Sequence, residues 1–229
     1  MKRPHTTMIL AMTADGKIAD KTRSPARFSS QRDQAHLEQR ISEVDGVLFG
    51  AGTLRAYGTT LRVSNPQLLE ARQQQNKPLQ PAQIVCSASA KIDPQLRFFE
   101  QPVPHWLLTT SKGAKFWQDA PEAKFERILV AESDGQIDWI AAFKQFSELG
   151  FQRMAILGGG NLIASLVSQD LIDEFWFTVC PLILGGETAP TPVEGEGFSM
   201  PEAKELELIN VEAFEQEVFL HYRRRRGNG

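Results

Sequence analysis

The 229-residue sequence predicts an α/β fold with a mostly parallel central sheet, helices on both faces of that sheet and a C-terminal antiparallel hairpin. Short apolar runs alternate with helical patterns through residue 184, which is typical of βα units. Residues 175–184 are apolar on both faces, as expected of a central strand that is covered on two sides. Residues 206–211 and 217–222 are extended runs around a short turn, and they predict a hairpin at a sheet edge.

The N-terminal segment predicts a strand, a turn and a helix, in that order. Residues 6–12 form a short apolar run that leads into an Asp-Gly turn. Ser29 or Ser30 can then cap a helix that runs to about Val44. Asp33 falls in the first turn of this helix, where the helix dipole stabilises a negative charge.

The middle of the chain continues the same alternation. Strands are predicted at 47–49, 84–86, 106–109, 128–131 and 154–157. Asn65-Pro66 begins a helix, because proline is tolerated at a first helical position. Asp138 begins an amphipathic helix that Gly150 ends, and residues 162–169 predict a further helix.

Length and composition indicate one globular domain over residues 1–229, with residues 223–229 as a flexible basic tail. The four consecutive arginines of this tail leave a contact with phosphate or with a partner as the alternative. The net charge of -3 gives no reason to expect nucleic acid, and no apolar run is long enough to span a membrane. Cys86 and Cys180 lack paired spacing, so we expect a reducing, cytoplasmic setting.

Glycines mark three predicted strand ends, and open α/β sheets bind their ligands at such ends. Gly158-Gly159-Gly160-Asn161 stands between a strand and a helix, where glycine lets the backbone approach a phosphate closely. A plain tight turn is the equally good alternative. Thr53, which follows Gly50-Ala51-Gly52, can bind a cofactor or cap a short helix. Asp15 can contact the substrate or the nicotinamide, or can simply form an Asp-Gly turn.

The sequence gives little support for a metal site, a P-loop NTPase, an α/β-hydrolase or a Rossmann dinucleotide site. The four histidines have no ligand-like spacing among themselves or with either cysteine, so we expect no metal site. The sequence contains neither G-x-x-x-x-G-K-[ST] nor G-x-S-x-G, which argues against a P-loop NTPase and an α/β-hydrolase. It also lacks the G-x-G-x-x-G fingerprint of a Rossmann dinucleotide site after its first strand.

Several family motifs follow one another in order over nearly the whole chain. They lie at 12–19 (MTADGKIA), 44–53 (VDGVLFGAGT), 156–160 (ILGGG), 171–174 (LIDE), 181–190 (PLILGGETAP) and 194–198 (EGEGF). With these motifs the chain resembles the pyrimidine reductases of riboflavin biosynthesis, which have a dihydrofolate-reductase-like fold. The resemblance is greatest to stand-alone archaeal-type reductases, since the H-x-E and P-C-x-x-C elements of a deaminase domain do not occur.

The resemblance implies a cytoplasmic, homodimeric enzyme that uses NADPH. Such an enzyme transfers hydride to C1′ of the ribosylamino group of a phosphorylated diaminopyrimidine and gives a ribitylamino product. The protein mainly holds cofactor and substrate in position, so no residue is assigned as a catalytic acid or base. The loop at 87–91 is expected to lie by the adenosine 2′-phosphate. The residues expected to bind the cofactor are Ala11, Gly50, Gly52, Thr53, Ser87, Lys91, Gly158, Gly159, Gly160 and Asn161.

The substrate half of the chain departs from the family. Its usual polar and charged residues are replaced here at Ile9, Ile41, Tyr57, Ser64 and Leu157. A leucine cannot hydrogen-bond a ribose or a pyrimidine, and Arg62 can replace the expected phosphate-binding arginine only if its loop shifts. The residues expected to border the substrate are Asp15, Ser29, Asp33, Tyr57, Arg62 and Leu157. A related NADPH-dependent reductase of another small molecule and a non-catalytic cofactor-binding paralogue stay open as alternatives.

Overall fold

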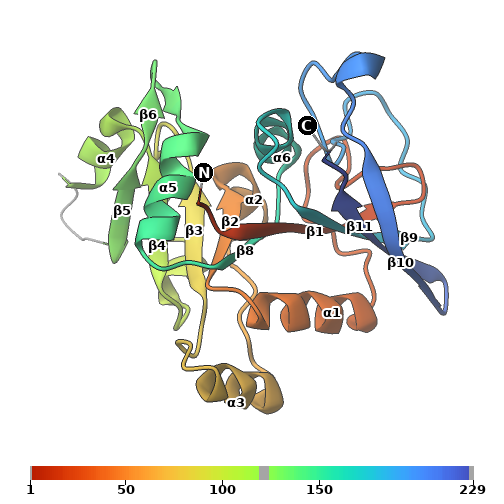
Figure 1. The fold of residues 1–229 in the computed structure, drawn as a ribbon, viewed down its shortest axis with the longest axis horizontal. Helices are drawn as coiled ribbons and strands as arrows, with labels where there is room; N and C mark the ends of the chain where they lie inside the picture. The colour runs from red at the N-terminus through yellow and green to blue at the C-terminus, as the bar shows by residue number, and fades with distance from the viewer. Residues whose placement is uncertain (1, 119–123, 227–229) are drawn as a thin grey trace. The chain divides into compact units, whose positions relative to one another are not determined.

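A computed structural model describes residues 2–118 and 124–226 of the chain (Figure 1). The chain divides into two compact units. Unit 1 comprises Met1–His5 and Glu38–Ala155, and unit 2 comprises Thr6–Leu37 and Ile156–Gly229. The sequence predicts a single domain over residues 1–229. The division into two compact units does not test that prediction. No helix of the described residues is both long and apolar enough to cross a membrane.

Unit 1 is built on four parallel strands that follow one another in the sheet. They are β2 (Gly46–Gly50), β3 (Ala82–Cys86), β4 (His105–Thr109) and β5 (Arg127–Val130). The connecting helices are α2 (Ala51–Tyr57), α3 (Pro66–Gln74), α4 (Ser111–Gln118) and α5 (Trp139–Glu148). The minor elements are a 3-10 turn (Arg97–Glu100) and the pair β6 (Glu132–Ser133) and β7 (Gln136–Ile137). The parallel arrangement predicted for this half is confirmed.

Local signals explain where the helices of unit 1 begin. The Asn65 side chain accepts a hydrogen bond from the Gln67 backbone N–H at 2.9 Å, and Asp138 does the same for Ala141 at 2.9 Å. Both residues therefore act as the predicted helix caps. The helix after β4 was not predicted, because its sequence, SKGAKFWQ, carries only a short apolar stripe.

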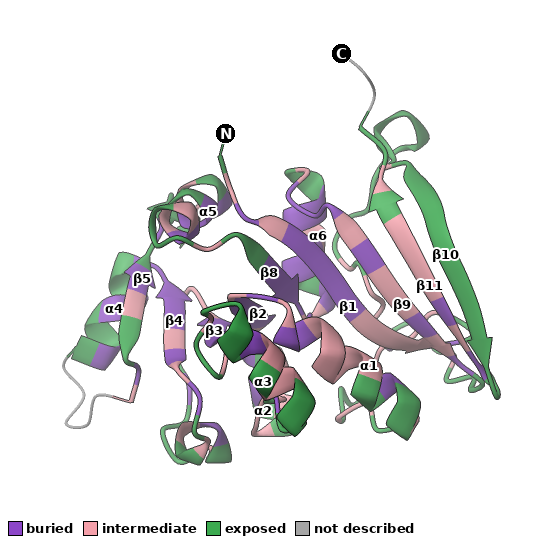
Figure 2. Ribbon diagram, turned by 60° about the horizontal axis from the view of Figure 1, so that its bottom comes forward, coloured by how far each residue is buried: buried purple, intermediate pink, exposed green. Residues whose placement is uncertain are grey.

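Unit 2 contains four strands in the order β10-β11-β9-β1. β1 (His5–Thr13) and β9 (Glu174–Cys180) are parallel, whereas β11 (Glu217–Arg224) is antiparallel to β9 and to β10 (Leu206–Phe214). The predicted hairpin is thus confirmed, and β10 forms the edge, exposed along its whole length (Figure 2). Unit 2 also contains α6 (Gly160–Ser168) and a 3-10 turn at Met200–Glu202, whereas α1 (Gln31–Ser42) begins in unit 2 and continues into unit 1 from Glu38. The strand β8 (Arg153–Ile156) precedes α6.

The predicted central strand at 175–184 is correct only as far as Cys180. β9 lies between β1 and β11, as expected, but it ends at Cys180. Pro181 follows and has no N–H with which to continue a ladder. Leu182, Ile183 and Leu184 are accordingly exposed.

Within the predicted flexible tail, residues 223–226 make defined contacts, whereas 227–229 lie outside the described residues. Arg224 is the last residue of β11, and its Nε lies 2.7 Å from Asp170 Oδ1. Arg226 binds Asp170 through Nε at 2.8 Å and Asp173 through Nη1 at 2.8 Å. These arginines are held by carboxylates of unit 2, which the composition of the tail alone does not reveal.

Candidate functional site

In unit 1, the predicted cofactor residues gather at one sheet edge. Gly50 and Cys86 are the last residues of β2 and β3, and they are register partners in a parallel pair. The segments that follow, 51–53 and 87–91, therefore begin at the same edge. This placement agrees with the expectation for Gly50, Gly52, Thr53, Ser87 and Lys91, although it does not test what these residues bind.

The Gly50–Thr53 segment is the start of α2 rather than a loop. Gly50 is the helix N-cap, with φ -76° and ψ 152°, and no side chain caps this end. Thr53 lies inside the helix, so its interpretation as an N-cap is wrong. A β-carbon placed on Gly52 would find no atom within 4 Å. The chain's own packing gives no reason for glycine at this position.

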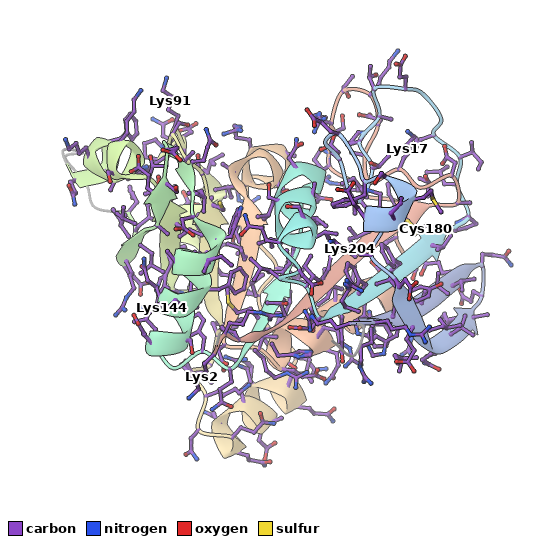
Figure 3. All side chains as sticks on the ribbon, turned by 45° about the horizontal axis from the view of Figure 1, so that its top comes forward. Lys2, Lys17, Lys91, Lys144, Cys180 and Lys204 are labelled. Carbon is purple, nitrogen blue, oxygen red and sulfur yellow. The ribbon has the colours of Figure 1, made fainter. Side chains whose placement is uncertain are left out.

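The loop at 87–91 is fixed by its own hydroxyl groups. Ser87 Oγ accepts a hydrogen bond from the Ala90 N–H at 3.1 Å, and Thr109 Oγ1 donates to the Ser87 carbonyl at 2.7 Å. Lys91 is exposed and points outward (Figure 3). Arg55 of α2 donates to the Lys91 carbonyl at 3.5 Å, which brings a second cation to this loop. Arg55 was not among the predicted cofactor residues, because a short helix here was considered only as the alternative in which Thr53 is its cap.

The unit 1 residues expected at the substrate lie at the end of α2 and in the loop after it. Tyr57 is its last residue and is 41% exposed. In the next loop, the Thr60 N–H and carbonyl are both held by the Gln101 side chain at 2.8 Å. Arg62 lies two residues further along and is exposed. The two hydrogen bonds to Gln101 therefore fix the loop two residues before Arg62.

In unit 2, Asp15 ties two segments together. β1 and β9 end as register partners at Thr13 and Cys180. The Asp15 carboxylate accepts hydrogen bonds from Thr13 Oγ1 at 2.5 Å, the Leu184 N–H at 3.2 Å and the Gly185 N–H at 2.6 Å. These bonds, first of all the one from Thr13, lower the pKa of Asp15. The contacts favour the turn-forming interpretation of this residue.

Asp33 belongs to a buried polar cluster with Ser29. Its side chain is hydrogen-bonded to Thr178 and Ser29, and only 7% of the residue is exposed. Burial raises the pKa of Asp33, and the nearby Glu217 carboxylate raises it further. The structure therefore brings two of the predicted substrate residues together.

Glu217 is the member of this cluster that sequence reasoning missed, since it lies 187 residues from Ser30. It accepts hydrogen bonds from the Ser30 N–H at 2.8 Å and from Ser30 Oγ at 2.5 Å. Ser30 Oγ in turn accepts from the Asp33 N–H at 3.2 Å, so Ser30 is the residue that caps α1. Burial raises the pKa of the neighbouring Cys180 thiol to about 12, which makes it a poor nucleophile.

The glycine turn of unit 2 connects β8 to α6. Leu157 follows β8 and is half-buried. Gly158 has φ 103°, a conformation that side chains rarely adopt, and the Gly158–Gly159 peptide bond is cis. Gly159 is the N-cap of α6, and Gly160 and Asn161 are its first residues. A β-carbon on Gly158 would meet only Ile163 Cδ1, at 4.0 Å, so there is room beside the turn.

The predicted residues are thus divided between the two units. In unit 2, Ala11 is half-buried in β1 and is the register partner of Thr178, which binds Asp33. Unit 2 also holds the glycine turn and Asp15, and unit 1 holds the edge formed by β2 and β3. Among the described residues, no group of three or more His, Cys, Asp or Glu side chains could hold a metal ion.

Known proteins resemble the chain along nearly all of its length. It is 30% identical over 201 residues to the 2,5-diamino-6-ribosylamino-4(3H)-pyrimidinone 5′-phosphate reductase of Archaeoglobus fulgidus, covering 86% of this chain and 89% of the relative. A pyrimidine reductase-like protein from Corynebacterium diphtheriae has a similar structure, with a TM-score of 0.80 at 18% identity, covering 97% of this chain and 92% of the other.

The fold is that of dihydrofolate reductase. The enzyme from Enterococcus faecalis, complexed with NADP(H), superposes with a TM-score of 0.54 at 12% identity and 97% coverage of both chains. The family model that describes the RibD C-terminal domain matches residues 4–220. The chain therefore belongs to the RibD C-terminal domain family.

Proposed function

We propose that this protein is the NADPH-dependent reductase of riboflavin biosynthesis that converts the ribosylamino group of a phosphorylated diaminopyrimidine to ribitylamino. The observation that carries the proposal is the family match over residues 4–220, together with the 30% identity to a reductase of that name. Cofactors such as NADPH supply the hydride in this chemistry. The chain's own residues then have to bind, orient and shield the reactants.

Room at the two glycine-marked strand ends supports NADPH as the cofactor. A β-carbon on Gly52 would find no atom within 4 Å, and one on Gly158 would meet only Ile163 Cδ1, at 4.0 Å. Gly159 and Gly160 place the free N–H groups of α6 beside the space at Gly158, where phosphate oxygens are stabilised. In unit 1, Lys91 and Arg55 supply positive charge beside the loop proposed to bind the 2′-phosphate.

On the substrate side, the buried cluster of Asp33 and Ser29 supplies polar groups. Because burial raises the pKa of Asp33, its carboxyl group is more readily protonated than a free one and can then donate a hydrogen bond. A second candidate function is the reduction of a different small carbonyl, imine or pteridine-like compound. Leu157 favours it, since its apolar side chain adjoins the glycine turn where the family usually has a carboxylate.

Cofactor binding and complementation test the proposal separately. Quenching of the four tryptophans by NADPH measures binding, and rescue of a riboflavin-requiring reductase mutant identifies the reaction. We expect both in the wild type. Gly159→Val should abolish NADPH binding while thermal unfolding shows a folded protein. Absence of binding at millimolar NADPH would contradict both candidate functions. Binding of NADPH without rescue would instead favour the reduction of a different small molecule.

We also propose that the protein is a cytoplasmic homodimer. Its two cysteines are free thiols, which suits a reducing compartment. The support for a dimer is a sheet face of unit 2 on which apolar residues of four strands are register partners. Its three rows are Met12, Val179, Val218 and Ala213; Leu10, Phe177, Leu220 and Val211; and Met8, Phe175, Tyr222 and Leu208.

This apolar face becomes more exposed toward the sheet edge. Met8 is buried, whereas Leu208 and Val211 are 53% and 56% exposed. Covering such a face with a second copy would remove apolar surface from water. Val211→Glu should therefore shift the mass in solution from twice 25.6 kDa toward 25.6 kDa. Asn210→Glu, which adds the same charge on the opposite face, is the control. A wild-type monomer would contradict the dimer.

A further inference from the structure

A segment of unit 2 covers the first turn of α6. The Glu194 N–H donates to the Gly160 carbonyl at 3.2 Å. A β-carbon placed on Gly160 would lie 2.6 Å from Glu194 Cγ and 2.9 Å from Glu194 Oε2. One placed on Gly195 would lie 3.8 Å from Ala164 Cβ. The chain around Glu194 therefore packs directly on the start of the helix.

The Glu194 carboxylate brings a negative charge to this helix start. Its side chain is only 17% exposed, and its Oε1 lies 2.7 Å from Nη2 of Arg23, whose side chain is 59% exposed. The start of a helix carries a partial positive charge that attracts anions. The protein thus holds an anion of its own, paired with one cation, beside the turn where we propose that phosphate binds.

The segment that carries Glu194 is joined to the segment that carries Arg23. The Ile18 N–H donates to the Pro190 carbonyl at 3.0 Å, and Lys17 Nζ donates to the Ala189 carbonyl at 3.2 Å. Figure 3 shows Lys17 beside this loop. Gly185 and Gly195, at the two ends of the loop, have φ of 63° and 90°, which only glycine adopts readily. The segments that carry Glu194 and Arg23 are therefore joined a few residues before each member of the ion pair.

We propose that the Glu194–Arg23 pair sets the strength with which the glycine turn binds a phosphate-bearing cofactor. Glu194 repels the incoming phosphate. Arg23 offsets that repulsion and, being the more exposed partner, supplies the cation that a phosphate oxygen reaches. Both are specificity-determining residues that act on binding rather than on hydride transfer. This inference rests on the proposed use of NADPH.

The test compares NADPH dissociation constants, measured by tryptophan fluorescence, for single and double variants of the full chain. Glu194→Gln should tighten binding about three- to tenfold, because it removes a like charge close to the phosphates. Arg23→Gln should weaken binding by a similar factor, and the double variant should fall between the two. The difference between wild type and Arg23→Gln should shrink as salt is raised. A residue with a merely structural role would not tighten binding when changed.

Matched controls separate this effect from a general change of charge. Glu196→Gln and Arg27→Gln remove one charge each from the same two segments, outside the Glu194–Arg23 pair, and should change affinity less than twofold. Weaker or unchanged binding in Glu194→Gln would overturn the inference. Because Arg23 is mostly exposed, Arg23→Gln should fold, and wild-type affinity in this variant would overturn the inference independently. If the wild type itself binds no NADPH, the proposed function fails instead.

Discussion

Two of the three glycine-marked strand ends, Gly50–Thr53 in unit 1 and the glycine turn in unit 2, look alike in sequence but differ in what surrounds them. In unit 1, a β-carbon on Gly52 would meet nothing within 4 Å. In unit 2, one on Gly160 would collide with Glu194 and with the Thr191 carbonyl oxygen. Gly160 is thus required by the packing of the chain itself, whereas nothing in the chain requires Gly52. A glycine that the fold does not need is the better indicator of a ligand.

The largest expected effect comes from filling the crowded position. Gly160→Ala should destabilise the protein by about 1–3 kcal/mol, because the new methyl group overlaps Glu194 and Thr191. Urea unfolding measures this loss. A stability equal to that of the wild type would show that the segment around Glu194 yields easily, and the contrast between the two glycines would then disappear.

A smaller effect should come from the buried carboxyl group of unit 2. Burial raises the pKa of Asp33 in the folded state, so its contribution to stability is greatest below the unfolded pKa and is lost as pH rises through the folded value. Asp33→Asn should remove this loss, so the stability of the variant relative to wild type should be higher at neutral pH than at pH 4. Unfolding midpoints between pH 4 and pH 8 measure it. The exposed Asp134→Asn of unit 1 is the control, and equal pH profiles for wild type and Asp33→Asn would contradict the prediction.

The smallest effect on stability should come from the open position of unit 1. Gly52→Ala should stabilise the protein by about 0.5 kcal/mol, since alanine is the better helix former and finds free space. The same variant should weaken NADPH binding, because the methyl group occupies the space proposed for the cofactor. Opposite signs for stability and affinity would sharpen the comparison. Unchanged affinity would remove Gly52 from the proposed site.

The sequence predicted the strands and most caps because these features are local. Asn65 and Asp138 cap their helices as expected, and 175–180 is a central strand. The resemblance to a known family supplied the fold and the candidate residues. The sequence did not reveal that Asp15 is already hydrogen-bonded to Gly185, since such pairing depends on segments that meet only in the folded chain.

Two other contacts were not predicted, because they too join segments that are distant in the sequence. Glu217 approaches Asp33 from a distant strand, and Glu194 approaches Gly160 from a loop without regular structure. No local pattern encodes either contact. Arg55 could have been found from the sequence. A helix that begins at Ala51 places Arg55 four residues later, on the same face of the helix as Ala51.

The carboxylate of Asp173 has a consequence for how the chain is made. It accepts a hydrogen bond from the Thr6 N–H at 2.9 Å and binds Arg226 Nη1 at 2.8 Å, so it joins two segments that lie far apart in the sequence. On the ribosome, Thr6 emerges before the Glu38–Ala155 segment of unit 1, and Arg226 emerges after it. Most of unit 1 is continuous and can fold as one segment during synthesis, whereas we expect unit 2 to reach full stability only after Arg226 has emerged.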